Sequence, residues 1–278
     1  MGGVTGPGWG KHLLVCEPRY FGVAYEINPY MRMEVRPDVV AAERQFRALV
    51  AILEDVGASM EYLLPVEGLP DLVFTANAGL VDGRRFVPSR FRHRERKGET
   101  PINVAWFRQR GYSIEELPGD EPFEGAGDAL PFGSPPVVVA AYRHRSSIRV
   151  HSALGSLLGA PVRSIELVDE RFYHLDLAFC PIDDRRAMVA GQALDQYGCR
   201  VVGSLVEEPI WLEDDEAASF CANSIVIGDV VVMPTCTPRL GRVLEAAGYQ
   251  VAIAPVGEFL KAGGGCRCLA LALDVSFS

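Results

Sequence analysis

The chain has 278 residues and a formal net charge of −9, with 49% hydrophobic and 23% charged residues. This composition is ordinary for a globular protein, and the length suffices to bury a large core. The negative charge argues against a protein that binds nucleic acid non-specifically, because such binding requires a basic surface. It mildly favours a cationic ligand.

Seven cysteines are scattered along the chain without a CxxC pair, and their number is odd. This usage is typical of reduced thiols in a cytoplasm and not of a disulfide framework. The N-terminal stretch has no long apolar run, and no span of about 20 apolar residues occurs. We therefore expect a soluble, cytoplasmic protein without a signal peptide or a membrane partner.

Helical periodicity or capping residues mark, in chain order, the segments 37–56, 102–110, 151–158 and 237–248. Pro37 suits a first helical turn and Gly57 a stop, while Thr237 and Pro238 suit an N-cap and a first helical residue. Short apolar strands are predicted at 137–141 and 225–233. No linker rich in Ser, Gly or Pro divides the chain, so we expect one domain over residues 1–278.

Five segments share a polar or reactive residue followed by an apolar run: FTANAGLV, FEGAGDAL, YHLDLAFC, FCANSIVI and GGGCRCLAL. The intervals between their markers are 47, 50, 49 and 45 residues, where the markers are Asn77, Glu124, His174, Asn223 and Cys268. Each interval holds enough chain for two or three strands and a helix. Five such units around an axis would form a closed α/β propeller, in which every unit brings one polar residue to a shared pocket.

A cysteine nucleophile needs a favoured thiolate and a proton shuttle. His174 is the best shuttle among the five histidines, and it stands two residues before Asp176. Residues i and i+2 of a strand point to the same face, so we expect both side chains to reach the pocket. Taken alone, His174 could equally be a buried core histidine.

Glu124 lies among glycines, in a segment that could also be a surface turn. With Asp176 it would place two negative charges near a thiol and raise the thiol pKa, and a bound cation would reverse that effect. A guanidinium is the obvious cation, because its planar N–H donors match carboxylate oxygens.

The segments 89–99 and 142–149 each contain several arginines. A solvated basic face is the simpler interpretation. The alternative is a clamp for a substrate carboxylate, which together with the guanidinium site would indicate an arginine-like amino acid.

The motifs FTANAGLV, SRFRHRERKGE, PFEGAGDAL, ERFYHLDLAFCP and EFLKAGGGCRC occur in this order. Over residues 13–273 they resemble the guanidine-modifying (pentein) superfamily, especially the arginine dihydrolase domain of cyanobacteria and next the dimethylargininases and arginine deiminases. The resemblance implies a five-bladed α/β propeller with pseudo-five-fold repeats. It also implies a hydrolase that acts through a covalent thiouronium intermediate.

The resemblance assigns the nucleophile to Cys268, the catalytic histidine to His174 and the guanidinium-binding carboxylates to Glu124 and Asp176. It implies further substrate-binding candidates, namely Asn77, Asn28, Arg90, Arg145, Phe74 and Asp128. The two arginines among them would bind the substrate carboxylate. The implied partner is a small molecule, arginine or an N-methylated arginine, and a homo-oligomer stays open.

Deiminases carry a carboxylate in the segment that matches FTANA, where this chain has Asn77, and the motif INP at 27–29 is shared with dihydrolases. A neutral ureido group needs a partner that can donate, and an amide offers both a donor and an acceptor. We therefore expect an arginine dihydrolase that yields ornithine, carbon dioxide and two ammonia. Dimethylargininase, deiminase and a non-catalytic arginine-binding protein are the alternatives.

Cys266 follows three glycines that we interpret as a hinge, and we expect it on the same strand face as Cys268, as a packed neighbour. A metal site built from both thiols and His174 is the alternative. Its local spacing is wrong for a common zinc site and a second cysteine pair is missing, so we expect neither a metal nor an organic cofactor.

Overall fold

The computed structural model describes residues 7–277. Its strands are β1 His12–Cys16, β2 Ser59–Leu63, β3 Gly79–Asp82, β4 Arg85–Pro88, β5 Ser113–Ile114, β6 Ala129–Phe132, β7 Val137–Tyr142, β8 Val162–Glu166, β9 Phe179–Pro181, β10 Arg186–Val189, β11 Glu208–Trp211, β12 Ile225–Ile227, β13 Val230–Met233, β14 Gln250–Ile253 and β15 Leu271–Ala272. Its α-helices are α1 Val39–Asp55, α2 Glu99–Gln109, α3 His151–Leu158, α4 Gln196–Leu205, α5 Asp214–Ala218, α6 Pro238–Ala246 and α7 Gly257–Leu260.

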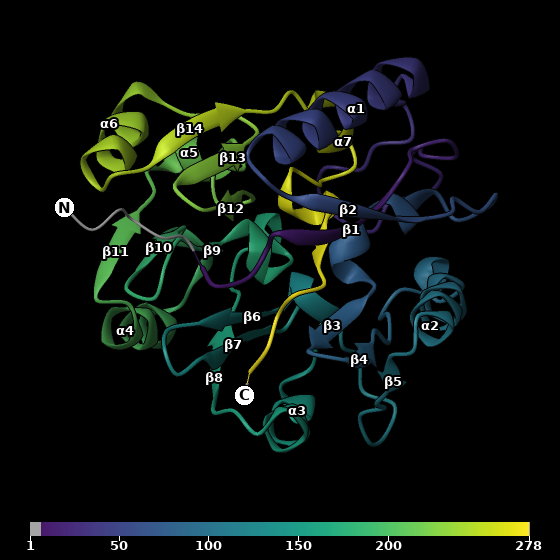
Figure 1. Ribbon diagram of the computed structural model, residues 1–278, viewed down its shortest axis with the longest axis horizontal. Coiled ribbons are helices and arrows are strands. Elements are labelled where there is room, and N and C mark those ends of the chain that lie inside the picture. Colours follow the sequence, from purple (N-terminus) through teal and green to yellow (C-terminus); the bar gives the residue numbers. More distant parts are fainter. Residues whose placement is uncertain (1–6, 278) are drawn as a thin grey trace.

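Within the described residues these strands form five three-stranded sheets around a central axis, with the longer helices on the outside of the ring (Figure 1). A blade begins with an antiparallel pair, continues through a helix and ends with a strand parallel to the middle one. In one blade, for example, β3 pairs with β4, α2 follows, and β5 pairs in parallel with β4. The predicted five-bladed α/β propeller is confirmed.

One blade joins the two ends of the chain. β15 pairs antiparallel with β1, with Ala272 opposite Leu13, and β2 pairs parallel with β1 after α1. The carboxylate of Asp274 accepts hydrogen bonds from the backbone N–H groups of Gly10 and Lys11 at 2.8 and 2.9 Å. Residues that are 264 positions apart therefore close the ring.

The four predicted helices are present; α3 has the predicted bounds, and the other three have shifted ends. The helix predicted over 37–56 is α1, and its cap is Asp38, whose carboxylate accepts a backbone N–H of the first turn at 3.0 Å. Thr237 caps α6 as predicted, with its hydroxyl accepting a backbone N–H at 3.1 Å. The other two predicted helices correspond to α2 and α3.

The strand predicted at 137–141 is β7, whereas the segment 225–233 is a hairpin of β12 and β13 and not one strand. Gly228 sits in the turn with φ at +60°, a conformation that glycine adopts without steric cost. The pair Gly228-Asp229, which interrupts the apolar run in the sequence, forms the two-residue turn.

The polar markers lie in tight turns and not at the start of strands, which corrects the expectation from the sequence. Short 3₁₀ helices precede the first strands of four blades: η2 Thr75–Asn77, η4 Gly125–Gly127, η7 Leu175–Leu177 and η9 Arg267–Leu269. Asn223 lies in a bend just before β12. The chain bends near the axis before it enters each blade.

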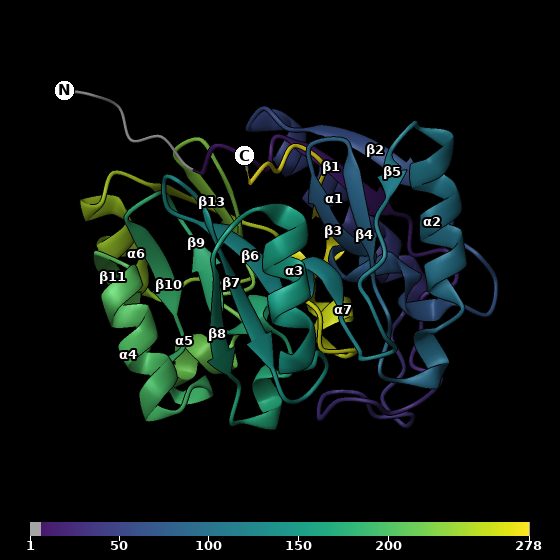
Figure 2. The same ribbon diagram turned by 90° about the horizontal axis from the view of Figure 1, so that it is seen from below.

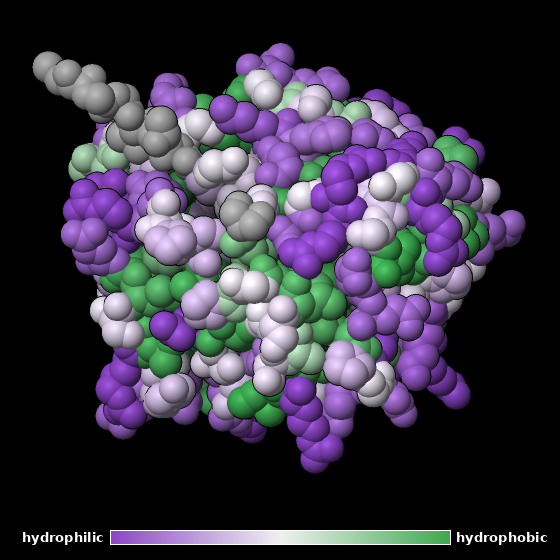
Figure 3. Space-filling model, turned by 60° about the horizontal axis from the view of Figure 1, so that its bottom comes forward, coloured by the Kyte–Doolittle hydropathy of each residue, from purple (hydrophilic) through white to green (hydrophobic). Residues whose placement is uncertain are grey.

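The core lies between the sheets and the surrounding helices, where for instance Phe86 of β4 stacks on Phe107 of α2 with ring centroids 3.6 Å apart. The side view shows α2, α3 and α4 along the outer wall (Figure 2). On the face in Figure 3, hydrophilic residues surround a central group of apolar ones.

None of the helices in residues 7–277 is both long and apolar enough to cross a bilayer. The prediction that the N-terminus lacks a signal peptide concerns, in part, residues 1–6, which lie outside the described residues.

Candidate active site

The turns near the axis bring the predicted catalytic residues together. Asn77 ends η2, Glu124 immediately precedes η4, His174 precedes η7, Asp176 lies within η7 and Cys268 lies within η9. η2 contacts both η4 and η9, and η4 contacts η7. Turns that are one blade apart in the sequence therefore lie in direct contact near the axis.

A small cavity lies beside these turns. Its wall includes the loop between β1 and α1, the glycine segment before Cys268 and the turns themselves. The lining residues are Ile27, Asn28, Met31, Asp71, Phe74, Asn77, Arg96, Arg145, Tyr173, His174, Ala262, Gly264 and Cys268.

Cys268 is buried, and two neighbouring turns hold it. Its thiol lies 3.4 Å from Oδ2 of Asp176, to which it can donate. Asn223 donates from Nδ2 to Sγ at 3.1 Å and accepts the Cys268 backbone N–H at 3.2 Å. Burial first, and the charge of Asp176 second, raise the pKa of the thiol well above its ordinary value. These surroundings favour a neutral thiol, and a cation bound beside it would favour the thiolate.

Asp176 is fully buried, and its Oδ1 has no hydrogen-bond partner among the described residues. Burial raises the pKa of this carboxyl to about 7, although the guanidinium of Arg267 opposes the shift. A buried carboxylate oxygen without a donor is costly, so this atom is suited to receive an N–H group of a ligand.

Glu124 is the most heavily paired carboxylate at the site. Its Oε1 accepts the backbone N–H of Arg92 at 3.1 Å, and its Oε2 accepts from Arg145 Nη1 at 3.0 Å and pairs with His174 Nε2 at 2.8 Å. Burial alone would raise the pKa of Glu124, but the positive charge of Arg145 and the hydrogen bond from His174 hold it well below its ordinary value. Glu124 is therefore ionised at neutral pH.

His174 is neutral at neutral pH. Burial lowers its pKa to about 4, against the opposing hydrogen bond to Glu124. An ionised carboxylate can only accept a hydrogen bond. Nε2 of His174 must therefore carry the hydrogen and donate it in the hydrogen bond to Glu124. The opposite ring nitrogen is then the one available to take up a proton during a reaction.

Asn77 faces the cavity between a cation and the backbone of Glu124. Its Oδ1 accepts a hydrogen bond from Nη1 of Arg96 at 2.9 Å, and its Nδ2 lies 3.5 Å from the Glu124 carbonyl oxygen. The amide therefore offers the cavity its donor side only. This narrows the expectation that Asn77 would offer both a donor and an acceptor.

Asn28 and Phe74 line the cavity wall as predicted. The side chain of Asn28 donates to the carbonyl of Ala262 at 3.1 Å and accepts two backbone N–H groups of its own loop, so it ties that loop to the glycine segment. A Cβ at Gly264 would lie 2.2 Å from the ring of Phe74. The glycines thus allow close packing against the cavity wall, and the hinge interpretation is not needed.

Two of the predicted substrate-binding residues lie outside the cavity wall. The guanidinium of Arg90 donates to the carbonyls of residues 117–119, which leaves it committed to that loop. In this arrangement Arg90 does not line the cavity. Asp128 accepts from the hydroxyl of Ser146 at 2.6 Å and from the backbone N–H of Leu175 at 3.1 Å, so it fastens η4 to η7.

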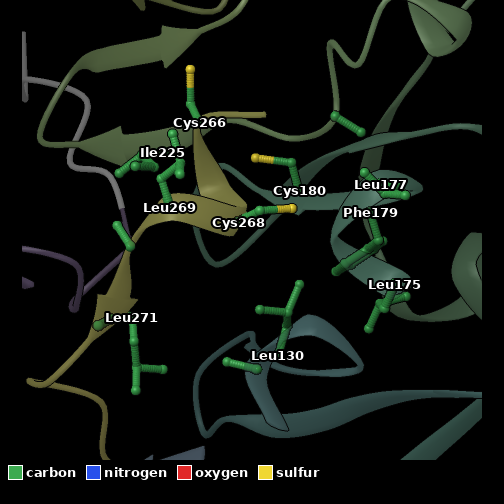
Figure 4. Packing of buried hydrophobic residues seen from close by; sticks show 14 of the residues in the cluster. Leu130, Leu175, Leu177, Phe179, Cys180, Ile225, Cys266, Cys268, Leu269 and Leu271 are labelled. Atoms are coloured by element: carbon green, nitrogen blue, oxygen red, sulfur yellow. The ribbon is translucent and has the colours of Figure 1, made fainter. Parts of the chain in front are cut away.

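Cys266 does not share a face with Cys268, because residues 267–269 form a 3₁₀ turn and not a strand. Successive side chains of such a turn are rotated by about 120°, so residues two apart diverge. Figure 4 shows the sulfur of Cys268 directed towards the segment of Leu175 and Leu177, and that of Cys266 directed away. The metal site of two thiols and His174 is not formed, and residues 7–277 contain no cluster of three acidic, histidine or cysteine side chains suited to a metal ion.

Sequence patterns did not single out several residues that the fold places at the site, although Arg96 belongs to the segment 89–99 that was considered as a carboxylate clamp. Asp71, Arg96 and Tyr173 line the cavity, and the hydroxyl of Tyr173 donates to the Gly263 carbonyl at 2.6 Å. Their positions depend on the packing of separate blades, which no local pattern reveals. Asn223 is different, since its place as the fourth marker of the repeat was a usable signal.

Comparison with known proteins gives relatives over nearly the whole chain. ArgZ of Synechocystis sp., a bifunctional arginine dihydrolase/ornithine cyclodeaminase, is 39% identical over 262 residues, which cover 93% of this chain and 37% of that protein. A dimethylarginine dimethylaminohydrolase of Mycobacterium tuberculosis is 34% identical over 261 residues, which cover 94% of this chain and 85% of that protein. No model of a protein family matches the chain.

A solved structure of the N-terminal domain of ArgZ, a Cys-to-Ser variant bound to substrate, aligns with a TM-score of 0.92 at 38% identity and covers 96% of this chain and 99% of that one. The chain thus spans about 37% of the full length of ArgZ. A dimethylarginine dimethylaminohydrolase structure aligns with a TM-score of 0.77 at 22% identity, which shows the shared fold. The chain belongs to the guanidine-modifying (pentein) superfamily.

Proposed function

We propose that the chain, as one guanidine-modifying domain over residues 1–278, is a cysteine-dependent hydrolase of the guanidinium group of arginine. We propose arginine dihydrolase activity, which gives ornithine, carbon dioxide and two ammonia. The observation that carries the proposal is the donor side of the Asn77 amide, held beside Glu124 in a cavity that also contains Cys268. The similarity to ArgZ supports the same activity.

The unpaired acceptors of the site support a substrate with two positive groups. Asp71 lines the cavity and its buried Oδ1 has no partner among the described residues, as is true of Oδ1 of Asp176 beside the thiol. Arginine carries a guanidinium at one end and an ammonium at the other. The two groups could supply donors to both atoms and relieve the cost of leaving them unpaired.

The first round starts when the bound guanidinium lowers the pKa of the Cys268 thiol. The thiol proton passes to His174, and the sulfur forms a bond to the guanidinium carbon. His174 then returns the proton to the departing nitrogen, and ammonia leaves a thiouronium adduct. Water adds to that carbon with His174 as base, the C–S bond breaks, and a bound ureido compound results.

The second round repeats the attack on a neutral group. Cys268 adds to the ureido carbon while the Asn77 amide donates to the ureido oxygen, and a second ammonia leaves. Water then cleaves the resulting thiocarbamate, which restores the thiol and gives the carbamate of ornithine, from which carbon dioxide is lost. The thiol supplies the covalent chemistry, so the proposed reaction needs no metal or organic cofactor.

The free thiols of all seven cysteines agree with a reducing compartment, so we also propose a cytoplasmic location. Conversion of arginine by protein purified from the cytoplasm would proceed without added oxidant or metal.

Product stoichiometry tests the proposal. The protein is incubated with arginine, with citrulline and with dimethylarginine, and ornithine, citrulline, ammonia and dimethylamine are quantified. We expect two ammonia and one ornithine per arginine consumed. One ammonia with citrulline as the end product would indicate a deiminase, and turnover of dimethylarginine alone would indicate the activity named for the M. tuberculosis relative.

A further inference from the structure

Arg267 directly precedes Cys268 in η9 but lines a different space. Cys268 lines the cavity described above, whereas Arg267 lines a second small space together with Trp9 and Cys180, and the two spaces have no lining residue in common. Arg267 is only 5% exposed. Consecutive side chains of a 3₁₀ turn are rotated by about 120°, so the turn directs a thiol into the cavity and a guanidinium into the neighbouring space.

The surroundings of Arg267 leave its charge poorly balanced. The guanidinium carbon lies 5.0 Å from the centre of the Trp9 ring, and most of the other lining side chains are apolar. No carboxylate within residues 7–277 forms an ion pair with this guanidinium, and burial lowers its pKa. Arginine nevertheless keeps its proton in proteins, so a positive charge is buried beside the candidate nucleophile.

Asp176 is the carboxyl group on which this charge acts. Burial has the larger effect on both groups, since it raises the pKa of Asp176 to about 7 and lowers the pKa of Arg267, and the attraction between the two opposes both shifts. Oδ2 of Asp176 lies 3.4 Å from the Cys268 thiol. The charge of Arg267 therefore favours the ionised form of the carboxyl group that contacts the thiol.

The remaining titratable groups around this pair are acids. They are Cys180, Cys268 and Asp274, which act on Arg267, and Asp128 and Tyr173, on which Asp176 acts. An acid is neutral or negative, so none of these groups can replace the positive charge of Arg267. A variant without this charge would leave Asp176 to depend on the cation that the substrate brings.

We propose that Arg267 is a positioning residue whose buried charge keeps Asp176 ionised before the substrate binds, so that the carboxylate can receive the substrate guanidinium. This role rests on the function proposed above. A protonated carboxyl group would have less capacity to accept N–H donors and no charge to attract them. Arg267 does not line the cavity, so it acts on the substrate through Asp176.

The test compares Arg267→Met with wild type in the pH dependence of kcat/KM for arginine. Methionine keeps an unbranched side chain but removes the charge. The acid limb of this profile reports groups of the free protein that must be ionised, and Asp176 has a pKa of about 7. We expect the limb to move to higher pH by about one unit, the order that a nearby charge provides inside a protein. At about pH 6 this is about a tenfold loss, which should shrink as the pH rises.

Two further variants separate charge from packing. Arg267→Lys keeps a cation and should have an acid limb close to that of wild type. Arg110→Met is the matched control, because the guanidinium carbon of Arg110 also lies over a tryptophan, 3.8 Å from the centre of the Trp106 ring, and Arg110 is not among the charges that act on Asp176. Its limb should coincide with that of wild type. Arg267→Gln takes the place of Arg267→Met if a thermal melt shows that the methionine variant does not fold.

Urea unfolding tests the same charge without any substrate. Loss of the Arg267 charge should raise the folded pKa of Asp176 further above its unfolded value of about 3.9. The stability that such a group contributes is complete at low pH and is lost as the pH rises through the folded pKa. The free energy of unfolding of Arg267→Met, relative to wild type, should therefore fall between about pH 6 and about pH 9, and that of Arg110→Met should not.

The outcomes separate the two proposals. A wild-type protein that does not hydrolyse arginine overturns the proposed function, and the unfolding measurement then decides the role of Arg267. A wild-type protein that hydrolyses arginine, with a folded Arg267→Met whose acid limb coincides with that of wild type, overturns the role of Arg267 alone.

Discussion

Glu124 and Asp176 are both buried carboxyl groups, yet their partners give them opposite acid–base behaviour. Glu124 has a cation and a histidine as donors and stays ionised, whereas Asp176 has one unpaired oxygen and titrates near neutral pH. This difference suits a site in which one carboxylate orients His174 and the other awaits a cationic ligand.

The position of the sulfur predicts which cysteine reacts. Cys268→Ser should reduce turnover by at least about a thousandfold, because a hydroxyl at this site has no comparable nucleophilicity. Cys266→Ser should retain most of the activity, since Cys266 is packed away from the cavity and burial raises the pKa of its thiol. Mass spectrometry of a trapped adduct gives the measurement, and an adduct on Cys266 would reverse the assignment.

The raised pKa of Asp176 predicts how stability depends on pH. Its folded pKa is about 7, and an aspartate in an unfolded chain titrates near about 3.9. Between these values the folded state holds a proton that the unfolded state has lost, so this group makes the protein less stable as pH rises. The free energy of unfolding of Asp176→Asn, relative to wild type, should therefore increase from about pH 5 to about pH 8.

Urea unfolding at both pH values gives this measurement. Asp183→Asn is the control, because the paired carboxyl of Asp183 has a lowered pKa, so its folded and unfolded forms are both ionised above about pH 5. Its stability relative to wild type should be the same at both pH values. A relative stability of Asp176→Asn that falls with pH would contradict the burial argument.

At the scale of elements, the 3₁₀ turns carry the candidate catalytic side chains, and each turn leads directly into the first strand of a blade. The glycine segment before η9 is part of this arrangement, because a Cβ at Gly265 would lie 2.8 Å from Oδ1 of Asn223, the atom that accepts the Cys268 backbone N–H. The thiol therefore depends on a side chain from the preceding blade.

Gly265→Ala should displace Asn223 and lower the rate of adduct formation by about tenfold or more, the order expected when a reacting group is misplaced. Gly203→Ala in α4 is the matched change, because a Cβ there would have no neighbour within 4 Å, and it should leave the rate unchanged. It should also stabilise the helix by about 0.5–1 kcal/mol. Equal rates in the two variants would show that the contact with Asn223 is dispensable.

At the scale of the whole molecule, the propeller is held closed by one blade that the two ends of the chain build together. Only β15 of that blade follows η9, so the same pairing that closes the ring also anchors the turn of Cys268. The two-residue strand β15 therefore links the stability of the closed ring to the position of Cys268, the proposed nucleophile.

Asp274→Ala should weaken the closure, because the carboxylate accepts two backbone N–H groups from the other end of the chain. We expect a loss of about 1–3 kcal/mol in the free energy of unfolding, the range for such hydrogen bonds. Asp229→Ala, which removes an exposed contact to Gln250 at 3.2 Å, is the control and should cost less. Urea unfolding compares the two, and equal losses would mean that the closure does not limit stability.

The sequence by itself determined the repeat and its chemistry. Marker residues at near-equal intervals predicted the propeller, and caps such as Asp38 and Thr237 lie within a residue of where local patterns placed helix ends. The sequence reveals these features because helix capping depends on neighbouring residues and because each blade needs about the same length of chain. The markers also predicted that Glu124, His174 and Cys268 would lie near one another, whereas Asp176 was added from its spacing to His174 and the role of Cys268 from the family resemblance.

Only the tertiary structure decided how the side chains around those markers face one another. Arg90 and Arg96 stand in one arginine-rich segment and look equivalent in the sequence, yet Arg90 binds a loop while Arg96 reaches the cavity. Cys266 and Cys268 diverge for the same reason, because the turn at the axis replaces the expected strand. The orientation of a side chain depends on contacts between blades that are distant in sequence, and no single segment contains that information.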